Sequence, residues 1–340
     1  MRMGDAGVDI RAVSNTASYG IARHRPGALS LTYSDYTVGW ICALPKELTA
    51  ATAVLDQIHP DLPKPPDDTN TYTLGSIGEH NIVIACLTKG RYGNNKSAMV
   101  GVNMVRTFPS IKVGLMVGIG GGIPSKVRLG DVVVSAPVDQ YPGVVQWDIG
   151  TVEDGGKLRR TGELDGPPSV LLTALTHMTA ASILNGYKIP GYLDDVGAKW
   201  PRLVPQYTQP PSPKGRMTTP IGHVSEQVDP NGFKRQSHEI CVHHGLIATG
   251  NKVIKDAKIR DSMNESLGGN VLCVEMEAAG LMDTFPCLVI RGICDYADAQ
   301  KNKVWQHYAA AVAAACAKEL LQHVTPSEID GEHRAKDFLG

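Results

Sequence analysis

Short apolar segments that favour strands alternate with helical segments along most of the chain. The segments 36–44, 111–124 and 287–295 are apolar and β-rich. Segment 45–58 has apolar residues at helical spacing, and segment 302–324 is long and rich in alanine. Such alternation is typical of α/β proteins with a mainly parallel sheet. We therefore predict a three-layer α/β/α sandwich around a central, mostly parallel mixed sheet.

Composition along the 340 residues suggests one large domain with polar flanks. We expect residues 1–34 to form a disordered extension and residues 325–340 to form a polar, frayed tail. Residues 36–324 should form a single domain. Within it, a proline-rich insertion at about 185–220 is expected to run over the surface.

The overall balance of residues argues against several classes of function. Hydrophobic residues make up 42% of the chain, charged residues 20%, and the net charge is −1. This balance offers no basic surface for nucleic acid and no polybasic patch for a membrane. No apolar run reaches transmembrane length, and the N-terminus lacks the apolar region of a signal peptide. We expect a cytoplasmic protein without nucleic-acid or membrane partners.

The cysteines and histidines give no sign of a metal site. The seven cysteines are scattered, with no CxxC pair, and no histidine has metal-ligand spacing to cysteine or aspartate. We expect reduced thiols, as in an intracellular protein, and no metal.

The stretch VEMEAAG, residues 274–280, contains two glutamates one residue apart. Acidic residues are rarely buried unless they are paired or take part in function. Four features of this chain fall at the ends of predicted strands, where parallel sheets bind their ligands. They are Glu47, the glycines at 118 and 120–122, the pair Glu275 and Glu277, and Asp295.

Together these features resemble the nucleoside phosphorylase/nucleosidase superfamily. That family includes purine nucleoside phosphorylase, uridine phosphorylase and methylthioadenosine/S-adenosylhomocysteine nucleosidase. The resemblance covers roughly residues 36–323 and is strongest to fungal members, which occur alone or as the N-terminal domain of larger receptor-like proteins. The segments that resemble family signatures are VGWICALPKEL, MVGIGGGIPSKVRLGDVVVS, GLIATGNKVI, VEMEAAG and RGICDYAD.

The resemblance assigns the ribose to the EME triplet. It implies that Glu277 accepts hydrogen bonds from the 2′- and 3′-hydroxyls, since a carboxylate has two oxygens suited to a vicinal diol. It also implies that Met276 packs on the sugar. Glu275 has two interpretations, as part of the sugar site or as the partner of a nearby donor. The residues alone favour a capped helix start with solvated acids.

The resemblance implies that Asp295 is the catalytic acid, which protonates N7 of the purine as the N-glycosidic bond breaks. An aspartate can do so near neutral pH only in an apolar pocket or beside another carboxylate. The preceding residues VIRGIC are largely apolar, which fits that requirement. The alternative is that Asp295 caps the following turn.

Glu47 bears on the choice between hydrolysis and phosphorolysis. The resemblance implies that nucleosidases use a glutamate here to orient and deprotonate water, whereas phosphorylases have cations and hydroxyls for phosphate. Met116 and Ile119 occupy two of those phosphate positions, which favours hydrolysis. Glu47 could instead only stabilise its helix through the dipole. Arg91 and the glycine-rich turn could form a different phosphate site, so a phosphorylase remains an alternative.

Recognition of the base is predicted for segment 251–256. Backbone groups near Ile254 are expected to face the purine edge. Val253 stands where the methylthioadenosine enzymes have a stacking aromatic residue, and Asn251 where nucleosidases have aspartate, so the base stays open. Tyr141 and Trp147 could shape the 5′ side or be surface aromatics. The glycine strand provides the remaining predicted substrate contacts: Gly118, Ile119 and Gly120.

The preferred hypothesis is a purine nucleoside hydrolase of purine salvage that needs no cofactor. The alternatives are a purine nucleoside phosphorylase of the same fold and a non-catalytic nucleoside-sensing module. The retained Glu47, Glu277 and Asp295 argue against a sensor, which needs neither an acid nor a water-activating base. By resemblance we expect a homodimer or a higher homo-oligomer.

Overall fold

The computed structural model describes residues 31–154, 158–210, 239–301 and 303–339. The chain divides into the units Met1–Leu31 and Thr32–Gly340, and the fold below is that of the second unit. The predicted disorder of residues 1–34 lies almost entirely outside the described residues. The part that is described includes a 3₁₀ turn, η1 (Tyr33–Asp35).

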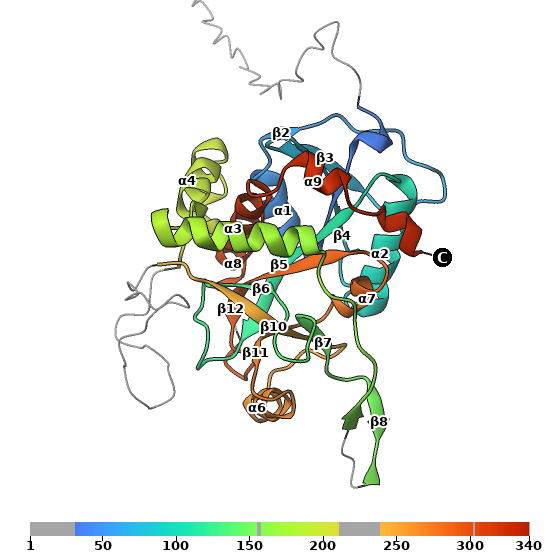
Figure 1. Cartoon of the computed structure of the whole chain (residues 1–340). Coiled ribbons are helices and arrows are strands. Elements are labelled where there is room, and N and C mark those ends of the chain that lie inside the picture. The colour runs from blue at the N-terminus through green and yellow to red at the C-terminus, as the bar shows by residue number, and fades with distance from the viewer. Residues whose placement is uncertain (1–30, 155–157, 211–238, 302, 340) are drawn as a thin grey trace, which may run out of the picture. The chain divides into compact units, whose positions relative to one another are not determined.

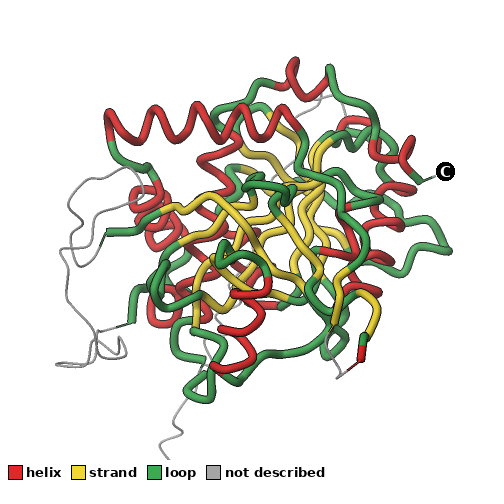
Figure 2. Tube along the Cα trace, turned by 60° about the horizontal axis from the view of Figure 1, so that its bottom comes forward, coloured by secondary structure: helices red, strands yellow, loops and turns green. Residues whose placement is uncertain are grey.

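A mixed sheet forms the centre of the domain (Figures 1 and 2). Its strand order in the described residues is β11-β10-β6-β12-β5-β1-β4-β3-β2, with β7 added beside β10. β8 and β9 pair with each other in a separate hairpin. The bounds are β1 Val38–Cys42, β2 Gln57–Ile58, β3 Tyr72–Ile77, β4 His80–Cys86, β5 Val113–Gly122, β6 Val132–Ser135, β7 Val144–Gln146, β8 Gly150–Val152, β9 Leu158–Arg160, β10 Val242–Thr249, β11 Val271–Glu275 and β12 Cys287–Asp295.

The central strand pairs are parallel, as predicted. β5 lies between β1 and β12 and is parallel to both, and β1 is also parallel to β4. The antiparallel pairs include β3 with β4 and β6 with β12. The far end of β5 also pairs antiparallel with β11, with Gly122 opposite Cys273 and Gly121 opposite Val274. This last pairing brings the glycine-rich end of β5 beside the strand that carries Glu275.

Helices cover both faces of the sheet, which confirms the three-layer prediction. Helices α1, α3, α4 and α8 lie together on one side, and α2 and α7 pack on the other (Figure 1). The alanine-rich α8 is almost wholly buried between α1 and strands β5 and β12, because its small side chains allow close approach. The bounds are α1 Pro45–Ala53, α2 Asn94–Thr107, α3 Ser169–Asn185, α4 Ile189–Lys199, α5 Val204–Tyr207, α6 Ala257–Ser266, α7 Ala279–Met282, α8 Gln306–Leu321 and α9 Pro326–Asp330.

The prediction that residues 325–340 form a frayed tail is wrong, because the described residues of this tail are folded onto the domain. Thr325 caps α9 with a capping box, and Ile329 is fully buried. Ala335 is also buried, and its N–H donates to the carbonyl of Ile111 at 2.7 Å. The short helix η3 (Ala335–Phe338) follows. A few buried apolar side chains hold the tail in place, although its overall composition is polar.

The predicted surface excursion at 185–220 is also partly wrong. Residues 189–199 and 204–207 are helices that pack against α8. Each has a proline in its first turn, where the missing N–H costs no hydrogen bond. The prolines therefore start helices here instead of marking a loop. Residues 211–220 of the predicted insertion lie outside the described residues. Among the described residues, no helix is long and apolar enough to cross a membrane.

Tight packing against two glycines yields a test of the fold. Gly39 and Gly114 are register partners on β1 and β5, and the ring of Phe285 packs against both. A Cβ added to Gly114 would lie 2.0 Å from Phe285 Cε1. We expect Gly114→Ala to lower the free energy of unfolding by about 1–3 kcal/mol through overpacking, measured by urea titration.

The matched control for this test is Gly191→Ala in α4, where an added Cβ would meet no atom within 4 Å. Alanine there should leave stability unchanged or raise it by up to about 1 kcal/mol. Equal stabilities for Gly114→Ala and the wild type would contradict the close packing of Phe285.

Candidate functional site

A cavity of about 180 Å³ opens where β1, β5, β11 and β12 end. Residues from all four strand ends line it, together with the first turn of α1 and the segment after β10. Most of the predicted site residues are among these lining residues. They are Glu47, Ile119, Gly120, Val253, Ile254, Glu275, Met276 and Glu277.

Glu47 is buried in the first turn of α1 and faces the cavity. Its Oε2 accepts the N–H groups of Ala43 and Leu44, both at 2.8 Å, and thereby caps the helix start. Its Oε1 accepts the N–H of Ile119 at 2.9 Å. Burial raises the pKa of the Glu47 carboxyl, while Arg291 and these N–H groups oppose the rise. Glu47 therefore both caps α1 and forms part of the cavity wall.

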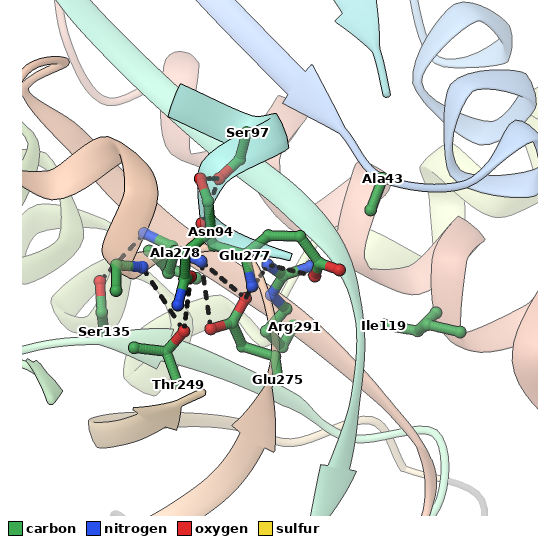
Figure 3. A network of polar contacts seen from close by, with 12 residues as sticks. Ala43, Asn94, Ser97, Ile119, Ser135, Thr249, Glu275, Glu277, Ala278 and Arg291 are labelled. Atoms are coloured by element: carbon green, nitrogen blue, oxygen red, sulfur yellow. Dashed lines mark hydrogen bonds and ion pairs between the residues drawn. The ribbon is translucent and has the colours of Figure 1, made fainter. Parts of the chain in front are cut away.

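Arg291 of β12 is fully buried and is not among the predicted site residues. Its Nη2 donates to Glu275 Oε2 and lies 3.8 Å from Glu277 Oε2 (Figure 3). A Cβ added to Gly118 would lie 2.5 Å from both Arg291 Nη1 and Glu47 Oε1. The absence of a side chain at Gly118 thus leaves room for both this guanidinium and this carboxylate.

Two nitrogens of Arg291, Nε and Nη1, are buried without a hydrogen-bond partner in the described part of the chain. Such groups are costly to bury, so an unpaired donor beside a cavity suggests a ligand. The sequence did hold a signal for this residue. An arginine inside the apolar run LVIRGIC of a central strand must be paired or functional.

The carboxylate of Glu275 binds N–H groups and a guanidinium of the protein itself. Its oxygens accept the N–H of Glu277 at 3.0 Å and that of Ala278 at 3.1 and 3.2 Å, in addition to the Arg291 bond. It therefore fits the second of its two predicted roles, the partner of a nearby donor. The simpler prediction of solvated acids is wrong, because Glu275 and Glu277 are each only 7% exposed.

Glu277 lines the cavity beside Met276. Burial raises the pKa of Glu277 to about 7, the nearby Glu275 carboxylate adds to the rise, and Arg291 opposes it. Its backbone carbonyl accepts the Ser97 hydroxyl at 2.6 Å, which ties the segment to α2. Figure 3 shows Glu275, Glu277 and Arg291 converging between β11 and β12.

Asp295 ends β12 opposite Gly121 and is buried just behind the cavity wall. Its Oδ1 accepts the N–H of Ala297 at 2.9 Å, so it does cap the following turn. Its Oδ2 lies 3.1 Å from Lys301 Nζ and accepts the Cys294 thiol at 3.1 Å. Burial agrees with the predicted surroundings, but the ion pair with Lys301 was not foreseen. A lone lysine in a loop carries no sequence signal of such a role.

Only part of the segment predicted to bind the base lines the cavity. Val253 is half exposed and Ile254 is buried, and both line the cavity. Asn251 does not line it: its N–H donates to Asp148 Oδ2 at 2.8 Å, and its Oδ1 accepts the N–H of Asn94. Tyr92 lines the cavity and is 47% exposed, so it is an aromatic residue that can contact a base in place of one at position 253.

The three residues suggested for an anion or 5′ site do not line the cavity. Tyr141 is buried in a small cluster with Val145 and Leu246. Trp147 packs against Gly250, and Arg91 is exposed in a turn. Gly118 also lies beneath the lining, where it admits Arg291 and Glu47. No group of ligands for a metal ion occurs among the described residues.

Comparison with known proteins agrees with this architecture. The family model described as Phosphorylase superfamily matches residues 37–325. The chain belongs to this superfamily. It is 48% identical, over 96% of its length, to a nucleotide-binding leucine-rich repeat (NLR)-like protein of Hyaloscypha variabilis, of which it covers 32%. It is 25% identical, over 88% of its length, to the ATP nucleosidase Cap17 of Escherichia coli, of which it covers 52%. The chain thus spans a third to a half of these relatives.

A solved structure shares the fold of this superfamily member. The 5′-methylthioadenosine/S-adenosylhomocysteine nucleosidase of Neisseria meningitidis, in complex with methylthio-immucillin-A, superposes with a TM-score of 0.55. The alignment has 17% identity and covers 84% of this chain and 98% of that one. At this identity the likeness concerns the fold.

The raised pKa of Glu277 predicts how stability depends on pH. The carboxyl has a pKa of about 7 in the folded protein, against an ordinary value of 4.5. The folded state therefore loses stability as pH rises through this window, because a buried charge forms. Glu277→Gln cannot ionise, so its stability relative to the wild type should improve between pH 5 and pH 8, by at most about 3 kcal/mol.

Urea unfolding at both pH values measures this difference. Glu265→Gln, which replaces an exposed glutamate of α6, is the control and should show no such trend. A constant difference between Glu277→Gln and the wild type would argue against a buried, proton-binding Glu277.

Proposed function

We propose that this domain hydrolyses the N-glycosidic bond of a purine nucleoside or of a nucleoside with a 5′ substituent. The observation that carries the proposal is a cavity lined by the buried carboxylates of Glu47 and Glu277. A carboxylate that faces such a cavity can accept a hydrogen bond from a water molecule and orient it. The nucleosidases among the relatives and the solved structures support the same reaction class.

In the proposed reaction, Glu277 accepts hydrogen bonds from the ribose hydroxyls. Glu47, which lines the cavity, holds water on the face of the sugar opposite the base. The C1′–N9 bond breaks and its electrons pass to the purine, which takes a proton at N7 from Asp295. The water oxygen bonds to C1′, and Glu47 accepts the released proton. The products are free base and free ribose.

The environment of Glu47 favours water over phosphate as the nucleophile. A buried carboxylate at this point would repel a phosphate dianion. Met116 is fully buried in the sheet and offers no donor, and the N–H of Ile119 is already bound to Glu47. Glu275 neutralises Arg291 directly. This environment therefore favours hydrolysis over phosphorolysis.

The reaction is tested with purified protein, adenosine and inosine in phosphate-free buffer, by chromatography of the free base. We expect base and free ribose without phosphate. Asp295→Asn and Glu47→Gln should each lower the rate about 10²–10⁴-fold, since each removes a proton-transfer group. Asp261→Asn, an exposed carboxylate on α6, is the matched control.

The product decides between the alternatives. Turnover only with added phosphate, yielding ribose 1-phosphate, would overturn hydrolysis in favour of a phosphorylase. Binding of nucleosides without turnover in either buffer would instead support a sensing module.

A further inference from the structure

Two apolar side chains in the lining of the cavity are left partly exposed. Tyr92 is 47% exposed and Val253 is 53% exposed, and both line the cavity. They come from separate segments: Tyr92 from the loop 88–93 between β4 and α2, and Val253 from the segment after β10. Apolar and aromatic side chains that line a cavity are those that a bound small molecule covers. The placing of these two segments should therefore affect the binding of a ligand.

The side chain of Asn251 joins the two segments. Gly93 precedes α2 and has no side chain to accept the free N–H groups of the first helical turn. Asn251 Oδ1 accepts the N–H of Asn94 at 3.3 Å instead. The N–H of Asn251 donates to Asp148 Oδ2 at 2.8 Å, which holds the backbone at this residue. Asn251 thus caps α2 from a distant part of the chain, although it does not line the cavity.

The start of α2 also contacts the segment proposed to bind the ribose. The Ser97 hydroxyl donates to the carbonyl of Glu277 at 2.6 Å (Figure 3). A Cβ added to Gly93 would lie 3.3 Å from Asn251 Oδ1 and 3.9 Å from the carbonyl oxygen of Met276. The end of the loop that adjoins α2 is therefore packed between the ribose segment and Asn251.

The loop itself is exposed and contains two glycines with positive φ. Residues 88–92 are all exposed. Gly90 has a φ of 80°, and a Cβ added there would meet no atom within 4 Å, while Gly93 has a φ of 95°. Glycine populates this region without strain, so the backbone can turn at both positions. An exposed segment of this kind opens easily, and its position depends on the contacts that hold its ends.

We propose that Asn251 is a positioning residue that holds the loop 88–93 against the cavity, so that Tyr92 covers a bound nucleoside. Val253 covers the nucleoside from the other segment. The inference rests on the hydrolytic function proposed above. Asn251 acts through the N–H of Asn94 and does not touch the nucleoside itself. Because Tyr92 contributes to binding and not to the breaking of the bond, this arrangement sets KM and leaves kcat unchanged.

Steady-state kinetics with adenosine test the contact and its dependence on Asn251. Tyr92→Ala should raise KM about 10- to 100-fold, since aromatic contacts are among the strongest in binding. Asn251→Ala should raise KM about 2- to 10-fold, as expected for one lost hydrogen bond. The double variant should have the KM of Tyr92→Ala alone, because Asn251 acts through Tyr92. Asn251→Asp should restore the wild-type KM, because a carboxylate also accepts the N–H of Asn94.

Limited digestion with trypsin tests the hold on the loop in the absence of any nucleoside. Trypsin cleaves after lysine and arginine, and the exposed Lys89 and Arg91 lie in the loop. Mass spectrometry should show cleavage at both residues about 2- to 10-fold faster in Asn251→Ala than in the wild type. Cleavage at the exposed Lys199 of α4 should stay at the wild-type rate, whereas a general loosening of the fold would raise it too.

Asn95→Ala is the matched control, since Asn95 is an exposed asparagine of α2 outside the cavity lining. It should change neither KM nor the cleavage of the loop. Asn251 and Tyr92 are exposed as well, so their substitutions should leave the fold intact.

The outcomes separate this inference from the proposed function. An unchanged KM in Tyr92→Ala, with adenosine still hydrolysed, would overturn the inference and leave the function intact. Additive effects in the double variant, or equal cleavage of the loop in the wild type and Asn251→Ala, would overturn the role of Asn251. Absence of hydrolysis of adenosine and inosine by the wild type would overturn the function itself, while the cleavage rates would still decide whether Asn251 holds the loop.

Discussion

The buried guanidinium of Arg291 is the constraint around which the site is organised. Moving a charge into a protein interior costs several kcal/mol unless paired groups compensate it. Glu275 binds this arginine directly, and the carboxylates of Glu277 and Glu47 lie close to it. These side chains come from strands β11 and β12, the turn after β11 and helix α1. The compensation therefore depends on all of these elements meeting at one place.

The far end of β5 makes that meeting possible. It pairs with β12 along one edge and with the end of β11 along the other. Gly118 leaves room for Arg291 and Glu47 to approach, and Gly121 lies beside Asp295. The glycine run thus serves the packing of charged side chains, since any Cβ at these two positions would overlap them. It lies in a strand, unlike the glycine-rich helix starts that bind anions.

The buried carboxylates that are proposed to act in the reaction also affect the stability of the fold. Burial raises the pKa values of both Glu47 and Glu277, and that of Glu277 rises to about 7. The same burial destabilises the folded state when they ionise, and Arg291 limits that loss. Lys301, which lines the cavity, forms an ion pair with Asp295.

The sequence by itself determined the α/β class and most strand and helix positions, because hydrophobic periodicity is a local signal. The acidic residues that line the cavity were predicted only through the resemblance to the superfamily. The sequence did not show that Ile329 anchors the tail, that prolines begin α4 and α5, or that Tyr141 lies in a core cluster. Only the tertiary structure decided which charges meet: Arg291 with Glu275, and Lys301 with Asp295. Those pairs depend on strand order and loop path, and neither can be read from residue spacing within a single chain.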